Sequence, residues 1–98
     1  MKLRINPLVA KDLKSIKDYI AEDNADKALE TVREIYHQFE NIQQFPYIGA
    51  GLSKRVSFKT DYKYVVWEEY VVLYKVGKEA VEIYRVVNWY QDITRIFE

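Results

Sequence analysis

The stretch YVVLYKVGKEAVEIYRVV, residues 70–87, decides the fold class. Two apolar runs of strand length, 70–76 and 80–87, flank the short segment Gly77-Lys78-Glu79. A segment this short predicts a tight turn, which joins two strands as antiparallel neighbours. The first run is apolar on both faces, which indicates a central strand of a sheet.

Shorter strands are predicted before this hairpin. Residues 64–67 are mostly apolar and end at Glu68-Glu69, which predicts a second tight turn. Val56 and Phe58 alternate with polar residues and favour one further short strand. Proline and glycine cluster only in residues 46–54, so we expect this stretch to connect helices to the sheet.

The first half of the chain has helical periodicity. Residues 2–6 alternate as a short strand, and Asn6-Pro7 then predicts a helix start. This helix should run from residue 7 to about residue 22, with Asp12 on its wet side. Its apolar stripe consists of Val9, Leu13, Ile16 and Ile20. A second helix is predicted over residues 25–44, and the short connection makes the two helices an antiparallel hairpin.

These elements predict one domain over residues 1–98, of the α+β class. An N-terminal strand precedes an antiparallel helix hairpin, which packs on a twisted, mainly antiparallel sheet of about four strands. Residues 92–98 are expected to add one helical turn whose Ile93, Ile96 and Phe97 pack back on the domain.

Composition excludes several kinds of protein. The 98 residues carry no formal net charge, which argues against nucleic-acid binding driven by bulk charge. There is no cysteine and one histidine, His37, so disulfides and the usual cysteine or multi-histidine metal sites are ruled out. We expect no metal and no cofactor. The sequence has neither a bilayer-spanning apolar run nor the apolar core of a signal peptide, so we expect a cytoplasmic protein without membrane contact.

Basic residues provide the first candidate site. Four of them fall within ten positions, with only Asp61 opposing them: Lys54, Arg55, Lys59 and Lys63. They form either a solvated loop or a local phosphate-binding patch. Arg85 interrupts an apolar strand, where a guanidinium is costly unless it is paired. It either pairs with an acidic side chain such as Glu82 or Asp92, or binds a phosphate or a partner's carboxylate.

The residues after this strand suit ligand binding. Trp89 and Tyr90 could stack on unpaired bases, or instead pack against the core and in a protein interface. Asn88 and Gln91 could orient a phosphate or a water molecule, or instead cap the final turn.

The order of these elements resembles the RelE/ParE family of bacterial type II toxins. Asn6-Pro7 stands where the family commonly has Ser-Pro, and Asp12-Leu13 lies in a matching helix pattern. Pro46 and Gly49 match the end of the second helix, and residues 81–87 match the strand before a polar tail. The resemblance covers nearly the whole chain. It implies a RelE-like fold, a cognate antitoxin, and either the ribosome with its mRNA or DNA gyrase as the target.

The resemblance implies a ribosome-dependent mRNA endonuclease, an mRNA interferase that arrests translation. In such members an RNA 2′-hydroxyl attacks the neighbouring phosphate, which requires a base, an acid and cations. On this hypothesis Arg85 holds the scissile phosphate, Tyr90 is the acid or base, and Asn88 and Gln91 orient the reactants. The RNA and phosphate contacts are assigned to Lys54, Arg55, Lys59, Lys63 and Trp89.

The alternative is a protein that binds without chemistry, either a ParE-like inhibitor of DNA gyrase or an attenuated toxin that mainly binds its antitoxin. Asn88 stands where the family often has His or Tyr, and Tyr90-Gln91 replaces a basic pair. Val71 stands where several nucleases carry an arginine. His37 belongs to the second predicted helix and supplies no base near the site.

Overall fold

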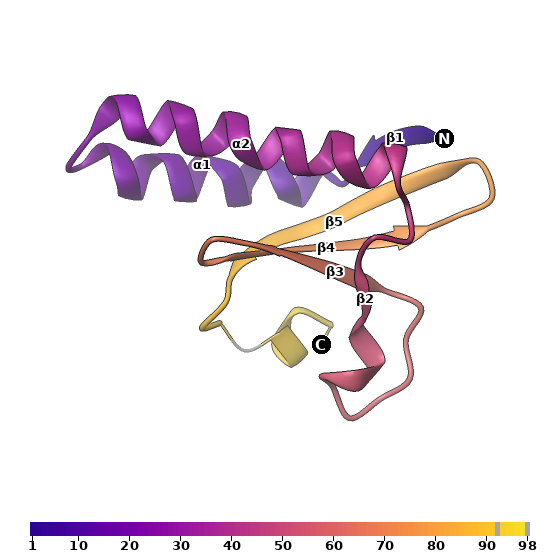
Figure 1. Ribbon diagram of the computed structural model, residues 1–98. Helices are drawn as coiled ribbons and strands as arrows, with labels where there is room; N and C mark the ends of the chain where they lie inside the picture. The colour runs from indigo at the N-terminus through magenta and orange to yellow at the C-terminus, as the bar shows by residue number, and fades with distance from the viewer. Residues whose placement is uncertain (92, 98) are drawn as a thin grey trace.

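The computed structural model describes residues 1–91 and 93–97, in which a helix hairpin packs on a sheet (Figure 1). The predicted α+β class, N-terminal strand and helix hairpin are confirmed. In chain order the elements are β1 (Lys2–Ile5), α1 (Pro7–Ala21), α2 (Ala25–Gln44), β2 (Ala50–Gly51), η1 (Leu52–Lys54), β3 (Lys63–Trp67), β4 (Tyr70–Val76), β5 (Ala80–Asn88) and η2 (Ile93–Phe97). Of the described helices, none is long and apolar enough to cross a bilayer.

The strands form one mixed sheet in the order β1-β5-β4-β3-β2. β1 runs parallel to β5, and the other neighbours are antiparallel. The predicted central position of β4 is confirmed. The strand predicted at 56–58 is wrong, because these residues form bends and β2 pairs with β3 instead. The hydroxyl of Ser53 fixes this loop by accepting from the Thr60 N–H and donating to the Thr60 carbonyl, each at 2.9 Å.

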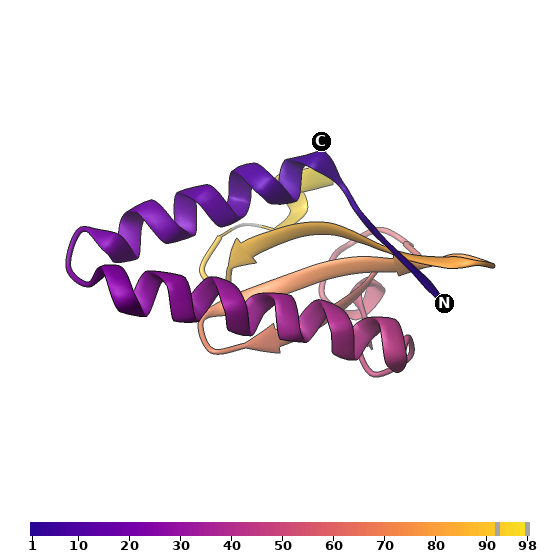
Figure 2. The same ribbon diagram turned by 90° about the horizontal axis from the view of Figure 1, so that it is seen from above.

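Asparagine side chains begin both helices. The Oδ1 of Asn6 accepts from the Leu8 N–H at 2.9 Å, and Pro7 occupies the first helical position as predicted. The Oδ1 of Asn24 accepts from the Lys27 N–H at 3.0 Å and starts α2. The two helices lie side by side over the sheet (Figure 2).

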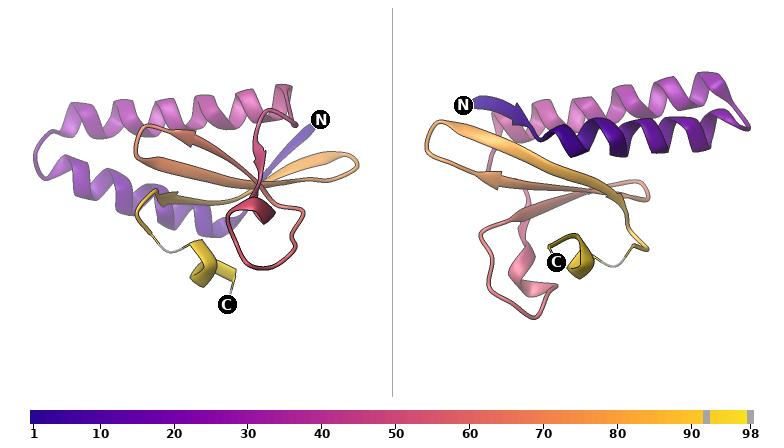
Figure 3. Two further views of the ribbon diagram at one scale, coloured as in Figure 1. Left: turned by 60° about the horizontal axis from the view of Figure 1, so that its bottom comes forward. Right: turned by 180° about the vertical axis from the view of Figure 1, so that it is seen from behind.

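The two faces of the sheet have separate apolar clusters. The helices and the sheet together bury Val9, Leu13, Ile35, Phe39, Ile42, Tyr70, Val72, Tyr74, Val81, Ile83 and Val86. On the opposite face Leu52, Val71, Leu73 and Val87 are buried beneath the loop after β2 and the C-terminal η2 (Figure 3). The expected packing of Ile93 and Ile96 is confirmed, since both lie against this second cluster, whereas the Phe97 side chain lies outside the described part. The middle of the sheet is therefore covered on both sides.

One buried tyrosine ties the connector after α2 to the sheet. The Tyr74 hydroxyl donates to the Pro46 carbonyl at 2.8 Å and accepts from the Gly49 N–H at 2.9 Å. A Cβ on Gly49 would lie 2.5 Å from that hydroxyl and 2.7 Å from the Tyr64 carbonyl oxygen. Position 49 therefore requires glycine because of this close approach.

An irregularity in the β4–β5 ladder sets which side chains of β5 face the helices. Leu73 pairs with Arg85 while the next residue of β4, Tyr74, pairs with Ile83, so β5 has one extra residue here. If the side chains of β5 alternated strictly between the two faces of the sheet, Val87 would lie on the same face as Ile83. Instead Val86 joins Ile83 in the helix-facing cluster, and Val87 joins the opposite one. This β-bulge changes the local direction of the strand at Arg85.

Candidate functional site

The guanidinium of Arg85 forms an internal ion pair with Asp12 of α1. Its Nε lies 2.8 Å from Asp12 Oδ2 and its Nη2 lies 2.8 Å from Asp12 Oδ1, which is a bidentate arrangement. The two side chains are only 22% and 12% exposed. The hydrogen bond that Arg85 donates to Asp12 is the main cause that raises the pKa of Arg85, against the lowering effect of burial. Arg85 therefore stays charged and bound to the helix layer.

Asp12 also completes the hydrogen bonding of β5 where β1 ends. The Asn6 N–H donates to the Ile83 carbonyl at 2.9 Å, and from there the chain turns away into α1. The Val86 N–H then lacks a strand partner on that edge, and Asp12 Oδ2 accepts from it at 3.0 Å. One carboxylate thus satisfies both a backbone donor and the guanidinium beside it.

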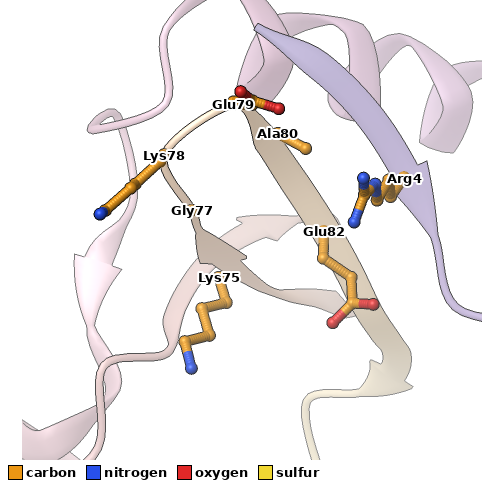
Figure 4. A pocket seen from close by; sticks show the side chains of 7 residues that line it. All are labelled: Arg4, Lys75, Gly77, Lys78, Glu79, Ala80 and Glu82. Carbon is orange, nitrogen blue, oxygen red and sulfur yellow. The ribbon is translucent and has the colours of Figure 1, made fainter.

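The predicted pairing of Arg85 with an acidic side chain is found, but the partner is Asp12 of α1 and not Glu82. Glu82 lies near Arg4 and Lys75, at a pocket of about 400 Å³ beside the β4–β5 turn (Figure 4). The alternative partner, Asp92, lies outside the described residues. The prediction that Asp12 lies on the solvent-exposed face of its helix is also wrong, since the Asp12 side chain is mostly buried.

The loop that carries Lys54, Arg55 and Lys59, called the basic loop below, contacts the segment after β5 through its arginine and not through its lysines. The guanidinium carbon of Arg55 lies 4.1 Å from the centre of the Trp89 ring and 5.5 Å from that of Tyr64, which are cation–π distances. The Nζ of Lys63 instead lies 5.6 Å from the Tyr47 ring. Lys54 and Lys59 are exposed.

The predicted site residues do not all lie on one side of the sheet. Arg85 is bound to α1, which covers one face. The loop with Lys54, Arg55 and Lys59 lies on the other face, where it packs through Leu52 and Val56 (Figure 3). The structure therefore brings Arg55 and Trp89 together but directs Arg85 elsewhere.

The polar segment after β5 is held by its own backbone. The Oδ1 of Asn88 accepts from the Tyr90 N–H at 2.9 Å, and the Asn88 carbonyl accepts from the Gln91 N–H at 2.9 Å. The Trp89 N–H donates to the Glu69 carbonyl at 2.7 Å. Asn88 thus serves as the cap of this turn, and the Tyr90 side chain projects outward, 87% exposed.

Sequence reasoning missed Asp12 as a partner of Arg85. A signal was present: Asp12 lies three residues after Val9 and four before Ile16, so it borders the apolar stripe of its helix. No group of acidic, histidine or cysteine side chains able to hold a metal ion occurs within residues 1–91 and 93–97.

A protein family and a solved structure both match this chain. No curated protein gave a significant match. A solved structure described as the chromosomal ParDE TA system from P. aeruginosa is 26% identical, with a TM-score of 0.75 over 90% of this chain and 95% of that chain. The family described as the ParE toxin of the type II toxin-antitoxin system, parDE, matches residues 3–92. Since this match covers nearly the whole chain, the protein belongs to the ParE toxin family of type II toxin-antitoxin systems.

Proposed function

We propose that this toxin acts in the cytoplasm by binding DNA gyrase, without cutting RNA, and that a cognate antitoxin neutralises it by binding. The observation that supports a mechanism without chemistry is the ion pair between Arg85 and Asp12. The family match and the similarity to a ParDE system support a toxin with a cognate antitoxin, and gyrase is the target that the ParE-like alternative implies.

RNA cleavage through the 2′-hydroxyl requires a base, an acid and a cation at the phosphorane. In the cleavage hypothesis Arg85 supplies that cation, yet two of its nitrogen atoms already donate to Asp12. Releasing the guanidinium for a phosphate would leave a mostly buried carboxylate without its partner, which is unfavourable. A role in holding β5 against α1 accounts for Arg85 without any substrate.

The nuclease remains a second candidate function, and a different observation favours it. Arg55, Trp89 and Tyr64 form one cationic and aromatic cluster, and the exposed ring of Tyr90 follows directly. Single-stranded RNA is commonly bound by aromatic rings that stack on bases beside basic side chains. With Lys54 and Lys59 nearby in sequence, this cluster could hold RNA at the ribosome.

Two assays on the purified chain separate the candidates. One measures supercoiling of relaxed plasmid by DNA gyrase, and the other maps breaks in mRNA on translating ribosomes by primer extension. We expect inhibited supercoiling and intact mRNA. Breaks within codons, with gyrase unaffected, would establish the nuclease and overturn our proposal.

Surface variants then locate the contact with the target. Tyr90→Ala removes an exposed ring, so it should weaken gyrase inhibition without lowering the melting temperature. Arg55→Ala should also weaken inhibition, with a small loss of stability because the guanidinium packs on the Trp89 ring. Lys78→Ala is the matched control, because Lys78 is an exposed cation in the β4–β5 turn, away from the cluster. Equal inhibition by all three variants would exclude the cluster from the gyrase contact.

A further inference from the structure

β1 forms one edge of the sheet, and β2 with the basic loop after it lies at the opposite edge. Along a strand, successive residues turn their backbone N–H and carbonyl groups to alternate sides. The Lys2 N–H donates to the Glu79 carbonyl at 2.9 Å. The Asn6 N–H donates to the Ile83 carbonyl, also at 2.9 Å. The even-numbered residues of β1 therefore bond to β5, and its odd-numbered residues direct their backbone groups away from the sheet.

The outward backbone groups of β1 are those of Leu3 and Ile5, and no hydrogen bond reaches them from the described residues. The edge is covered just before the strand, where Gln43 Nε2 donates to the Met1 carbonyl at 2.9 Å. From Leu3 to Ile5 it is open. An open edge with regularly spaced donors and acceptors is a template for one more strand.

The side chains of β1 give this edge one apolar face and one cationic face. Leu3 packs against the helix-side cluster, and alternation places Ile5, 40% exposed, on the same face. Lys2 and Arg4 lie on the helix-free face, and both are exposed.

The hollow of about 400 Å³ beside Arg4 extends the cationic face across β5 to β4 (Figure 4). Its charged lining consists of three cations and two carboxylates: Arg4, Lys75, Lys78, Glu79 and Glu82. In the part of the chain that the structure describes, none of the three cations forms a salt bridge. With Lys2 added, the surface beside the edge is positively charged, which favours carboxylates in an occupant.

The same charges disfavour a second copy of the chain at this edge. Antiparallel pairing of two β1 strands would place Lys2 and Arg4 of both copies on one face. Like charges on neighbouring strands are destabilising, so the occupant needs the opposite charge on that face.

We propose that β1 binds an extended, acidic segment of a partner protein as an additional strand of the sheet. The backbone of the segment bonds to Leu3 and Ile5. Its side chains alternate: carboxylates face Lys2 and Arg4, and branched apolar groups face Ile5 and the helices. The inference does not depend on whether the toxin acts on gyrase or on RNA, because neither function assigns a role to β1.

The test uses the full chain and a fluorescent peptide that alternates glutamate and valine, followed by anisotropy. A comparison peptide carries lysine in place of glutamate. We expect the glutamate peptide to bind and the lysine peptide not to bind. Absence of binding by the glutamate peptide would overturn the proposal, and the cations of β1 would then serve only to keep the edge from aggregating.

Two N-methylated peptides test the backbone contact. One is methylated at every valine amide and the other at every glutamate amide, and only one of these sets faces β1 in a paired strand. We expect one methylated peptide to lose binding and the other to bind nearly as tightly as the unmodified peptide. Equal binding by the two would refute strand addition.

Matched charge variants distinguish the edge from non-specific attraction. The edge variant combines Lys2→Gln with Arg4→Gln. The control combines Lys11→Gln with Lys17→Gln, two exposed positions of α1. Both variants remove two positive charges. We expect the edge variant to bind the glutamate peptide about fivefold more weakly, from the loss of two exposed ion pairs, and the control to change by less than about twofold. Equal weakening would exclude β1 as the site.

A proline variant removes one outward donor of the edge. Ile5→Pro deletes an N–H that points away from the sheet, where proline is tolerated in edge strands, so it should abolish peptide binding with a small loss of stability. Peptide binding as tight as that of the unchanged chain would contradict the proposal. Sedimentation of the free chain should show a monomer. Self-association that Ile5→Pro abolishes would assign the edge to a second copy and overturn the proposal.

Discussion

The ion pair between Arg85 and Asp12 is expected to hold β5 against α1, and a double-mutant cycle measures this directly. The variants are Asp12→Ala, Arg85→Ala and their combination. Three hydrogen bonds end on the Asp12 carboxylate: two from the guanidinium at 2.8 Å and one from the Val86 N–H at 3.0 Å. Asp12→Ala removes all three acceptor contacts and leaves a mostly buried cation without a partner.

The magnitude follows from burial. Breaking a fully buried pair by removing one partner costs about 3–5 kcal/mol. Here the side chains keep 22% and 12% of their exposure, so water compensates in part and we expect about 2–3 kcal/mol for Arg85→Ala. Asp12→Ala should cost about 1 kcal/mol more, because the Val86 N–H also loses its acceptor. The double variant should cost less than the sum by about 1.5–2 kcal/mol, since neither charge is left alone.

Urea denaturation followed by circular dichroism gives the four free energies of unfolding. The control cycle uses Lys14 and Asp18, which form an exposed pair on the same helix with side chains 77% and 60% exposed. Its coupling should be much smaller, because both groups remain in water. A coupling between Asp12 and Arg85 that is no larger than the control would refute the structural role of the pair. It would also restore Arg85 as a candidate for binding phosphate.

Three further predictions test other contacts. Gly49→Ala should destabilise the fold by about 2–3 kcal/mol in urea denaturation, because the new Cβ would meet a backbone oxygen and a buried ring. The control Gly51→Ala should change stability little, because nothing lies within 4 Å of a Cβ at that position. Equal effects of the two variants would contradict the close approach at Gly49. Burial raises the pKa of the Tyr74 hydroxyl in the folded protein above the ordinary tyrosine value of about 10. The stability that Tyr74 contributes is therefore fully present below about pH 10 and is lost as the pH rises through the folded pKa. Tyr74→Phe should reduce this alkaline loss of stability, and an unchanged pH profile of unfolding would refute the raised pKa of Tyr74. Glu68 has a φ of 54° at the first position of a two-residue turn, so Glu68→Gly should stabilise the fold by about 0.5–1 kcal/mol, and a lower melting temperature would contradict this.

Local sequence patterns were enough to predict the helices and the main strands. Asn6-Pro7 and Asn24 are caps whose hydrogen bonds form within three residues, so their effect does not depend on distant contacts. The segments at 68–69 and 77–79 were predicted as tight turns, and both join antiparallel neighbours. The short strand β2 was missed because its two residues have no periodicity and only the pairing with β3 defines them.

The candidate site was less predictable because its contacts join distant parts of the chain. Trp89 and Arg55 were assigned to one RNA-binding set, but their contact required the loop to fold beneath the sheet. A rule of strict alternation cannot place Arg85, because the bulge in β5 changes which residues face the helices.

The sequence by itself determined the class of the fold, its two helices and main strands, and the family, since capping, periodicity and turn chemistry act over a few residues. Only the tertiary structure decided that Arg85 is bound to Asp12, 73 positions earlier in the chain. It also decided that β1 lies at an edge of the sheet, where one side of its backbone has no neighbouring strand. The physical reason is that a charge is paired by whichever group lies nearest in space, and that distance is fixed only when the helices pack on the sheet.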